Sequence, residues 1–456
     1  MGRAFFRAFR IHEAMHDSVG LQVAERASER MALAARTPRA AETRASGGPM
    51  TMVEVRAAGY VVFEDGVYDI TRFAARHPGG AFLLSMRGQD LTFAFDNAHA
   101  RSRVAQRALR AAWVAPFAEA SRDPLERDAL ALRRALRAEG FFSYGRRRLA
   151  FDVLRWSMGL AFAAVAFPHG HAVAFLLLLA TTVDVVWWIH DAGHDAVFED
   201  ERRARRIIEW LGVAFLGMPQ QGYHYGVHRV HHGTTNVVGM DQALETGPLA
   251  WDAATAATKP ALFRRARWVQ WFLVIVPAAG PALLVSALSH CVRRRQWGLL
   301  GAIAARWIAV GGLCAYLHAP TLLIVPWVAG SILGFMAGLN HFHMPLSREL
   351  GPSYVRAVFE RTQNIENAGR FWHWLSGGLD LHVEHHLFPT MASHRYREVA
   401  PRVRALAAAH GLPYHATSRL GAIRKLLRAL RSPPPVLAAA AESSAPAGCP
   451  FHRRAS

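Results

Sequence analysis

Five apolar runs occupy the middle of the chain, between stretches rich in charged residues. Residues 149–167 and 172–189 form the first two and are separated only by Pro168-His169-Gly170-His171. Each run is close to the roughly 20 residues that a helix needs to cross the hydrocarbon core of a bilayer. Arginines precede the first run and follow the second, as is typical of cytoplasmic flanks. The pattern predicts a transmembrane helical hairpin with both ends in the cytoplasm.

The last two apolar runs, residues 298–317 and 320–339, predict a second transmembrane hairpin. Arg306 lies inside the first of them, so its side chain must face protein or reach toward the membrane surface. Four crossings place residues 190–267 and 340–456 on the same side of the membrane, which the arginine pattern indicates is the cytoplasmic side.

The remaining apolar run, residues 268–291, has arginines on both sides and is interrupted between Pro277 and Pro281. Basic residues at both ends argue against a single crossing. We interpret this run as a re-entrant or interfacial segment, with Trp268 and Trp271 in an interfacial aromatic belt. Four further tryptophans are candidates for lining a tunnel between the helices: Trp187, Trp188, Trp372 and Trp374.

The pattern of residues 51–117 predicts a small soluble module. Residues 59–63 and 67–70 are strand-like and are separated by a turn at Gly66. His77-Pro78-Gly79-Gly80 has the composition of a loop, helical segments follow, and the module closes near Trp113. The whole chain is therefore predicted to be mostly α, with a small α+β module before a four-span helical membrane domain. The expected parts are an extension (1–50, helical or disordered), the small module (51–117), a linker helix (118–148), the membrane domain (149–415) and a partly disordered tail (416–456).

Composition agrees with a membrane protein. Hydrophobic residues make up 52% of the chain and charged residues only 19%, below the roughly 25% of average proteins. The formal net charge of +19 comes almost entirely from arginines, which stand in short runs beside the apolar segments. We therefore assign the charge to the membrane flanks and expect no nucleic-acid partner. Three cysteines exclude a disulfide scaffold and a zinc ribbon.

The chain has 24 histidines, and they cluster. The spacing within each cluster puts the imidazoles on one face of a helix, where they can point at a common centre. Eight histidines are too many for one zinc ion, which takes four ligands, so two metal ions held by histidine are the natural fit. His341, at the end of the last apolar run, is a ninth candidate. The clustered residues are His190 and His194; His228, His231 and His232; and His382, His385 and His386.

A metal centre beside a membrane indicates a substrate that lives in the membrane. Histidine-bound iron activates O₂, so attack on a C–H bond of a lipid chain is the expected chemistry. Asp191, Asp195 and Asn340 are candidates for orienting the ligands through hydrogen bonds. His343, His373 and His394 are weaker ligand candidates. The remaining histidines considered are read as ordinary core or surface residues: His169, His171, His290, His318, His410 and His415.

The clusters resemble the three histidine boxes of the membrane fatty acid desaturases. Thr235-Asn236 and Asp241 follow the second cluster as in that family, and the segment 384–389 (Glu-His-His-Leu-Phe-Pro) resembles its third box in the front-end, acyl-lipid branch. The likeness covers roughly residues 140–415. It implies that the eight clustered histidines bind two non-haem irons, with His341 as a weaker addition. His382 departs from the pattern, because front-end relatives with a fused haem module usually have Gln there.

Residues 51–117 resemble cytochrome b5. The matching segments are 67–73 (Val-Tyr-Asp-Ile-Thr-Arg-Phe), 77–80 (His-Pro-Gly-Gly) and 95–99 (Phe-Asp-Asn-Ala-His). The resemblance implies that His77 and His99 are the two axial ligands of haem b. Two imidazoles would close both axial positions of the haem iron and leave it suited to electron transfer.

Together the resemblances imply an O₂-dependent desaturase of a long-chain acyl lipid or acyl-CoA. Electrons would pass from an NAD(P)H-dependent reductase through the fused haem to the di-iron centre, on the cytoplasmic side. A hydroxylase on the same scaffold is the main alternative, and a membrane electron-transfer protein is another. The preference for arginine over lysine suggests a bacterial inner membrane. Chain length, double-bond position and acyl carrier stay open.

Overall fold

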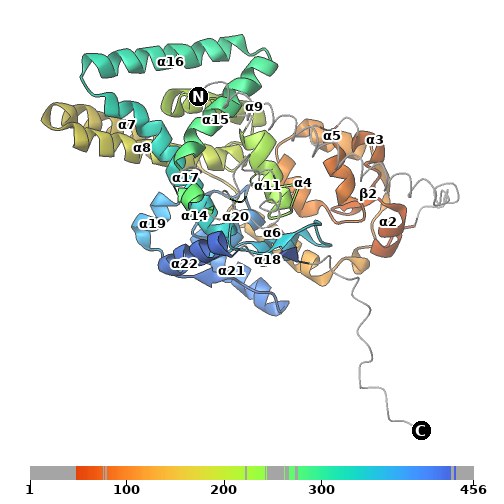
Figure 1. Ribbon diagram of the computed structural model, residues 1–456. Helices are drawn as coiled ribbons and strands as arrows, with labels where there is room; N and C mark the ends of the chain where they lie inside the picture. Colours follow the sequence, from red (N-terminus) through yellow and green to blue (C-terminus); the bar gives the residue numbers. More distant parts are fainter. Residues whose placement is uncertain are drawn as a thin grey trace, which may run out of the picture.

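The computed structural model describes residues 48–74, 77, 80–220, 223–241, 243, 261, 267–272, 276–432 and 436–437. Most of the predicted extension (1–50) and the tail beyond 437 lie outside these residues. Figure 1 shows a helical body with a small N-terminal domain on one side and the long helices α7, α8 and α16 on the other.

The N-terminal domain contains an antiparallel sheet in the order β1 (Val61–Phe63), β2 (Gly66–Tyr68), β3 (Trp113–Pro116). The first two strands confirm the predicted pair, and β3 is the closing segment near Trp113. Val61 and Ile70 are buried on one side of this sheet and Val62 and Val67 on the other. The helices of the domain are α2 (Met52–Ala58), α3 (Thr71–Ala74), η2 (Gly80–Met86), α4 (Thr92–His99) and α5 (Arg103–Arg110).

The linker contains helix α6 (Pro124–Ala138), which starts with Asp123 as its N-cap and Pro124 in the first turn. Its buried face, with Leu125 and Leu136, joins a core that also holds Phe93 from α4 and Phe388. The linker therefore packs the N-terminal domain against the body of the molecule.

Within the described residues, four helices are long and apolar enough to cross a membrane, as the sequence predicts. Many of their large apolar side chains are exposed, including Phe151, Phe162, Leu176 and Ile308, as expected of surfaces that face lipid. The four are α7 (Arg146–Ala166) with η4 (Phe167–His169), α8 (His171–Gly193), α16 (Trp297–Tyr316), and η9 (Pro320–Ile324) with α17 (Val325–His341). Helices α7 and α8 pack side by side (Figure 1).

The Arg306 side chain in α16 faces protein, which is one of the two environments that the sequence predicts for it. Its guanidinium donates to the backbone carbonyls of Ala214 (3.3 Å) and Phe215 (3.4 Å) and lies over the Trp307 ring. These carbonyls belong to the π-helical turn η5 (Gly212–Leu216). The charge inside an apolar helix is thus satisfied by an adjacent backbone.

The segment around residues 268–291 differs in part from expectation. Helix α15 (Val276–Arg293) runs through Pro281, where a break was predicted, and follows the short helix α14 (Arg267–Gln270). It is not among the four spanning helices of the described residues. Trp271, expected in an interfacial belt, is instead fully buried. Its ring packs against Phe335 and Phe342, both on or beside α17.

The rest of the body is built from short helices and two parallel strand pairs, β4 (Leu346–Ser347) with β7 (Val436–Leu437) and β5 (Asn364–Ile365) with β6 (Ala416–Thr417). The helices are η3 (Glu119–Ser121), α9 (Glu201–Leu211), η6 (His224–His228), α11 (Arg229–Thr234), α18 (Tyr354–Arg361), α19 (Gly369–Leu375), α20 (His382–Leu387), η10 (Ser393–Arg395), α21 (Tyr396–Ala409) and α22 (Arg419–Arg431).

The buried Glu126 side chain connects the linker helix α6 to α18. We expect it to make the stability of the folded protein depend on pH. Its carboxyl accepts hydrogen bonds from the Ser353 hydroxyl (2.5 Å) and the Val355 N–H (3.5 Å). Burial raises the pKa of Glu126 from 4.5 to about 8. The folded state therefore holds a proton that the unfolded state releases, so stability falls as the pH rises from 4.5 to 8. Glu126→Gln should raise Tm at pH 8 and flatten its dependence between pH 6 and pH 8.

The measurement is thermal unfolding of the detergent-solubilised protein across that range. Glu139→Gln is the control, because Glu139 caps the same helix but is exposed and pairs with Arg402. An unchanged pH dependence in Glu126→Gln would contradict the assignment.

Candidate metal centre and haem site

Nine histidines from separate parts of the chain meet at the C-terminal ends of α8 and α17. All are buried except His228, which is half-buried. His190 and His194 end α8, His341 ends α17, and the other two clusters lie on η6–α11 and on α20. Apolar membrane helices thus deliver three of the imidazoles, and short helices of the body deliver six. The structure brings together all nine residues that the sequence singled out.

The inward nitrogens approach one another closely. The His190 and His228 Nε2 atoms are 3.0 Å apart, and His341 Nε2 lies 3.0 Å from His386 Nε2 and 3.2 Å from His231 Nε2. Two groups result, each with ligand atoms within 4.8 Å of one another: His190, His194, His228 and His385; and His231, His341 and His386. A further group, His232, His385 and His386, overlaps both. His382 Nε2 lies 2.6 Å from His341 Nε2.

Several inward nitrogens have no hydrogen-bond partner in the described part of the chain, including both ring nitrogens of His194 and of His232 and Nε2 of His385. A buried nitrogen without a partner is costly, and a cation between the rings would satisfy it. Burial, and then the neighbouring imidazoles, hold the pKa of each of these three histidines well below 6.5. The rings are therefore neutral, which is the form that binds metal. The donor set fits two closely spaced histidine-bound ions.

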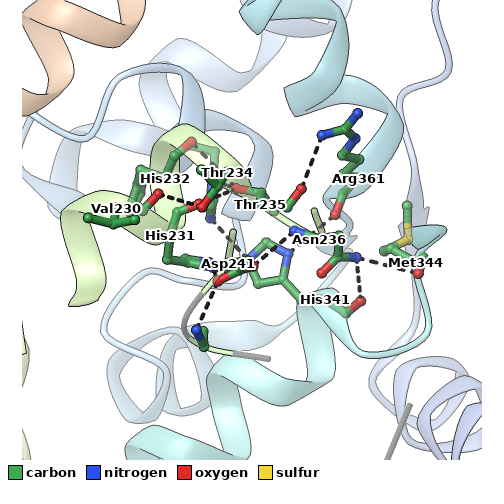
Figure 2. A network of polar contacts seen from close by, with 12 residues as sticks. Val230, His231, His232, Thr234, Thr235, Asn236, Asp241, His341, Met344 and Arg361 are labelled. Atoms are coloured by element: carbon green, nitrogen blue, oxygen red, sulfur yellow. Dashed lines mark hydrogen bonds and ion pairs between the residues drawn. The ribbon is translucent and has the colours of Figure 1, made fainter. Parts of the chain in front are cut away.

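Outer hydrogen bonds fix the orientation of four rings. His231 Nδ1 lies 2.9 Å from the Asp241 carboxylate, and His386 Nδ1 lies 3.2 Å from the Thr235 hydroxyl. His385 Nδ1 contacts the Tyr396 hydroxyl (3.1 Å), and His341 Nδ1 contacts the Arg361 carbonyl (3.2 Å). With Nδ1 engaged, Nε2 is free to point inward. Figure 2 shows His231, Asp241 and His341 within this network, with Asn236 beside them.

The three residues expected to orient the ligands have other partners. Asp191 accepts from the Ser393 N–H (2.9 Å) and hydroxyl (2.8 Å), and its carboxylate is 3.6 Å from His190 Nδ1. Asp195 pairs with Arg229 at 2.9 Å. Asn340 donates to backbone carbonyls of Met336 and Leu379. Asp191, inside α8, therefore lies within ion-pair distance of one cluster ring, whereas Asp195 is paired with Arg229 and Asn340 is bonded to the backbone.

The weaker ligand candidates lie outside the three groups of converging histidines. His373 Nδ1 is 2.6 Å from Asp380, and the His394 ring packs edge-on against Tyr144. His343 is also outside these groups, and burial lowers its pKa to about 4.

Sequence reasoning missed His224, which is buried with its ring centroid 6.5 Å from that of His190. It stands four residues before His228, and this spacing could have shown that both lie on one helical face. The ring also explains Gly193, because a Cβ there would meet His224 Nδ1 at 2.5 Å. Tyr396 and Arg361 were missed as well, and no local pattern marks either residue.

In the N-terminal domain, His77 and His99 face each other. Their ring centroids are 6.0 Å apart with the planes at 90°. Two metal–nitrogen bonds of about 2 Å plus the ring radii require roughly this spacing. Phe73 packs edge-on against His77, and Phe95 packs against His99. Burial lowers the pKa of His99 to about 4, which keeps the imidazole neutral. The pair fits bis-histidine ligation of one iron.

Comparison with known proteins agrees with both sites. The family model "Fatty acid desaturase" matches residues 168–418, and the model "Cytochrome b5-like Heme/Steroid binding domain" matches residues 55–126. All nine converging histidines fall inside the first range, and His77 and His99 fall inside the second.

Similar proteins span most of the chain. Fatty acid desaturase 3 of Bos taurus is 27% identical over 409 residues, which cover 82% of this chain and 89% of that protein. The acyl-lipid (9-3)-desaturase of Physcomitrium patens is 27% identical over 85% of this chain and 77% of its own length. The acyl-lipid (8-3)-desaturase of Rebecca salina is 28% identical over 78% and 86%. The chain therefore belongs to the fatty acid desaturase family, as an oxidoreductase with a cytochrome b5-like domain at its N-terminal side.

Proposed function

We propose that this protein introduces a double bond into a long-chain acyl group of a membrane lipid, using O₂ and electrons delivered through its own haem. The observation that carries the proposal is the convergence of nine imidazoles at the C-terminal ends of two membrane-spanning helices. Eight of them are buried, and several have a ring nitrogen without a partner among the described residues. The names of the Physcomitrium and Rebecca relatives support an acyl-lipid substrate. Acyl-CoA is the other carrier to test.

In this proposal His190, His194, His228 and His385 hold one iron, and His231, His341 and His386 hold the other. His232 and His382 complete the set between them. Iron bound by histidine supplies O₂ activation and the removal of two hydrogens from adjacent carbons. Asp241, Thr235, Tyr396 and the Arg361 carbonyl keep the rings oriented. Haem b would be held by His77 and His99, and an NAD(P)H-dependent reductase would supply its electrons.

A small apolar pocket lies beside the metal centre, between α8, α17 and the segment after α9. It is lined by Val186, Leu216, Met218, Gln220, Tyr223, His224, Gly330 and Leu333. An acyl chain that reaches the histidines from the membrane-spanning helices would have to widen it. Trp187 and Trp188, the tunnel candidates on α8, are buried, and Trp187 donates to the Leu375 carbonyl.

The proposed orientation puts all three histidine clusters and the haem domain in the cytoplasm, because arginines flank the α7–α8 hairpin at Arg146–Arg148 and in α9. The bacterial origin suggested by arginine usage stays a prediction, since the matched relatives come from animals, Physcomitrium patens and Rebecca salina.

Expression of this protein should change the fatty acids of the host. Gas chromatography–mass spectrometry of fatty acids from a host expressing the wild type should reveal a new unsaturated chain that is missing with His385→Ala. Separation of lipid classes before hydrolysis shows whether the chain is on a membrane lipid. A hydroxylated chain in its place would favour the alternative monooxygenase and contradict the desaturase.

The two metal sites should be separable. His385→Ala should lose non-haem iron and keep the b5-type absorbance spectrum, because His385 is far from the haem pair in sequence and belongs to the membrane domain. His77→Ala should lose haem and keep the non-haem iron. Iron analysis and optical spectra of the purified proteins measure both. Loss of both centres in each variant would refute the two-site assignment.

Asp241 should set the affinity of the second iron through His231. Asp241→Asn keeps the shape but removes the charge, and loss of such an outer partner typically weakens metal binding about 10- to 100-fold. Chelator competition followed by iron analysis measures it. Asp380→Asn is the matched control, because Asp380 pairs with His373, outside the cluster. Equal iron loss in both variants would count against the role of Asp241.

A further inference from the structure

The helix that carries His99 lies directly on the helix that carries His231 and His232. Helices α4 and α11 pack together, and Figure 1 shows them side by side where the N-terminal domain meets the body. Phe93, also on α4, stacks on Tyr354 and packs against Phe388. The haem site and the metal centre are therefore held in one fixed arrangement.

Arg229, the first residue of α11, connects the two sites. Its Nη1 donates to the Ala98 carbonyl at 2.6 Å, and its Nε and Nη2 donate to the Gly193 carbonyl at 3.0 and 2.7 Å. Nη2 also pairs with Asp195 at 2.9 Å. The residue is 9% exposed.

Each of the two carbonyls bonded by Arg229 belongs to the residue directly before a candidate metal-binding histidine. Ala98 precedes His99 of the haem pair, and Gly193 precedes His194 of the metal centre. Arg229 itself follows His228, another histidine of that centre. One guanidinium thus links the backbone beside a haem-site histidine with the backbone beside a metal-site histidine, from a residue that itself adjoins a second metal-site histidine.

Stability alone does not account for this arginine. Burying a charged pair costs solvation, and apolar replacements of similar size are often as stable. A flat guanidinium with five donors can bridge carbonyls on different helices, which the compact lysine ammonium does less well. The geometry therefore indicates that Arg229 fixes the position of the Ala98 and Gly193 backbone relative to each other.

We propose that Arg229 is a positioning residue for electron transfer, which holds the His99 and His194 segments together and provides a hydrogen-bonded route between the haem and the metal centre. The inference rests on the proposed function. Each transfer oxidises ferrous haem to ferric haem and reduces one ferric non-haem iron to ferrous. Two transfers reduce the pair, and the NAD(P)H-dependent reductase restores ferrous haem after each.

Arg133 provides a matched control. It is a buried arginine that also contacts α4, donating to Asn97 Oδ1 at 3.2 Å and pairing with Asp96 at 3.3 Å. Arg133 belongs to the linker helix α6, and its hydrogen bond and ion pair are both made with residues of α4. Its loss weakens the attachment of α4 without breaking the Arg229 bridge.

The experiment follows haem absorbance in the full-length protein in nanodiscs, without O₂. One electron equivalent of dithionite per protein reduces the haem, and the ferrous band then decays as the electron passes to ferric non-haem iron. Wild type, Arg229→Met, Arg229→Lys and Arg133→Met are compared after their haem and iron contents are measured. His385→Ala reports the decay that remains without the metal centre.

We expect Arg229→Met to slow the decay about 10- to 100-fold, the range seen when outer partners of metal ligands are lost, with haem spectrum and iron content unchanged. Arg229→Lys should fall between, and Arg133→Met should stay close to wild type. A wild-type rate in Arg229→Met, or equal slowing in Arg133→Met, would overturn the proposal. Loss of haem or iron in both Arg229 variants would assign a structural role instead. Equal decay in wild type and His385→Ala would overturn the proposed function and this inference with it.

Discussion

Nine imidazoles that converge on one site need partners for the ring nitrogens that point inward. The arrangement of the residues around the site follows from this requirement. Both ring nitrogens of His194 and His232 lack partners in the described residues, although both side chains are buried. A protein tolerates such groups in its interior when a cation completes them. The proposed irons are therefore part of the packing of this domain as well as of its chemistry.

The fold serves this site by giving four of the rings a hydrogen-bond partner on their outer side. Asp241, Thr235 and Tyr396 contact three Nδ1 atoms from outside the cluster. Helices α8 and α17 bring their histidines from the membrane-spanning region, so the site lies where an acyl chain could leave the bilayer. Trp271, fully buried between Phe335 and Phe342, fills the space beside α17.

The haem domain is attached through its functional helix. Phe93 on α4 enters the same core as Phe388, which directly follows the third cluster. Asn97 contacts the Tyr354 hydroxyl at 3.0 Å, and that hydroxyl donates to the His386 carbonyl at 2.7 Å. Polar and apolar contacts thus fix the helix of His99 against two of the three clusters. A haem protein on a separate chain would have to form such contacts anew at every encounter.

The sequence by itself determined the features that depend on local periodicity. Apolar runs located the four spanning helices, and the i, i+3, i+4 spacing of His228, His231 and His232 placed those imidazoles on one helical face. The likeness to two known families further linked His77 with His99. Only the tertiary structure decided what touches those faces. Tyr396 reaches His385 from another helix, Asp195 turns to Arg229, and Arg229 joins segments more than 90 residues apart. Such contacts depend on how helices pack in three dimensions, and spacing along the chain carries no record of that packing.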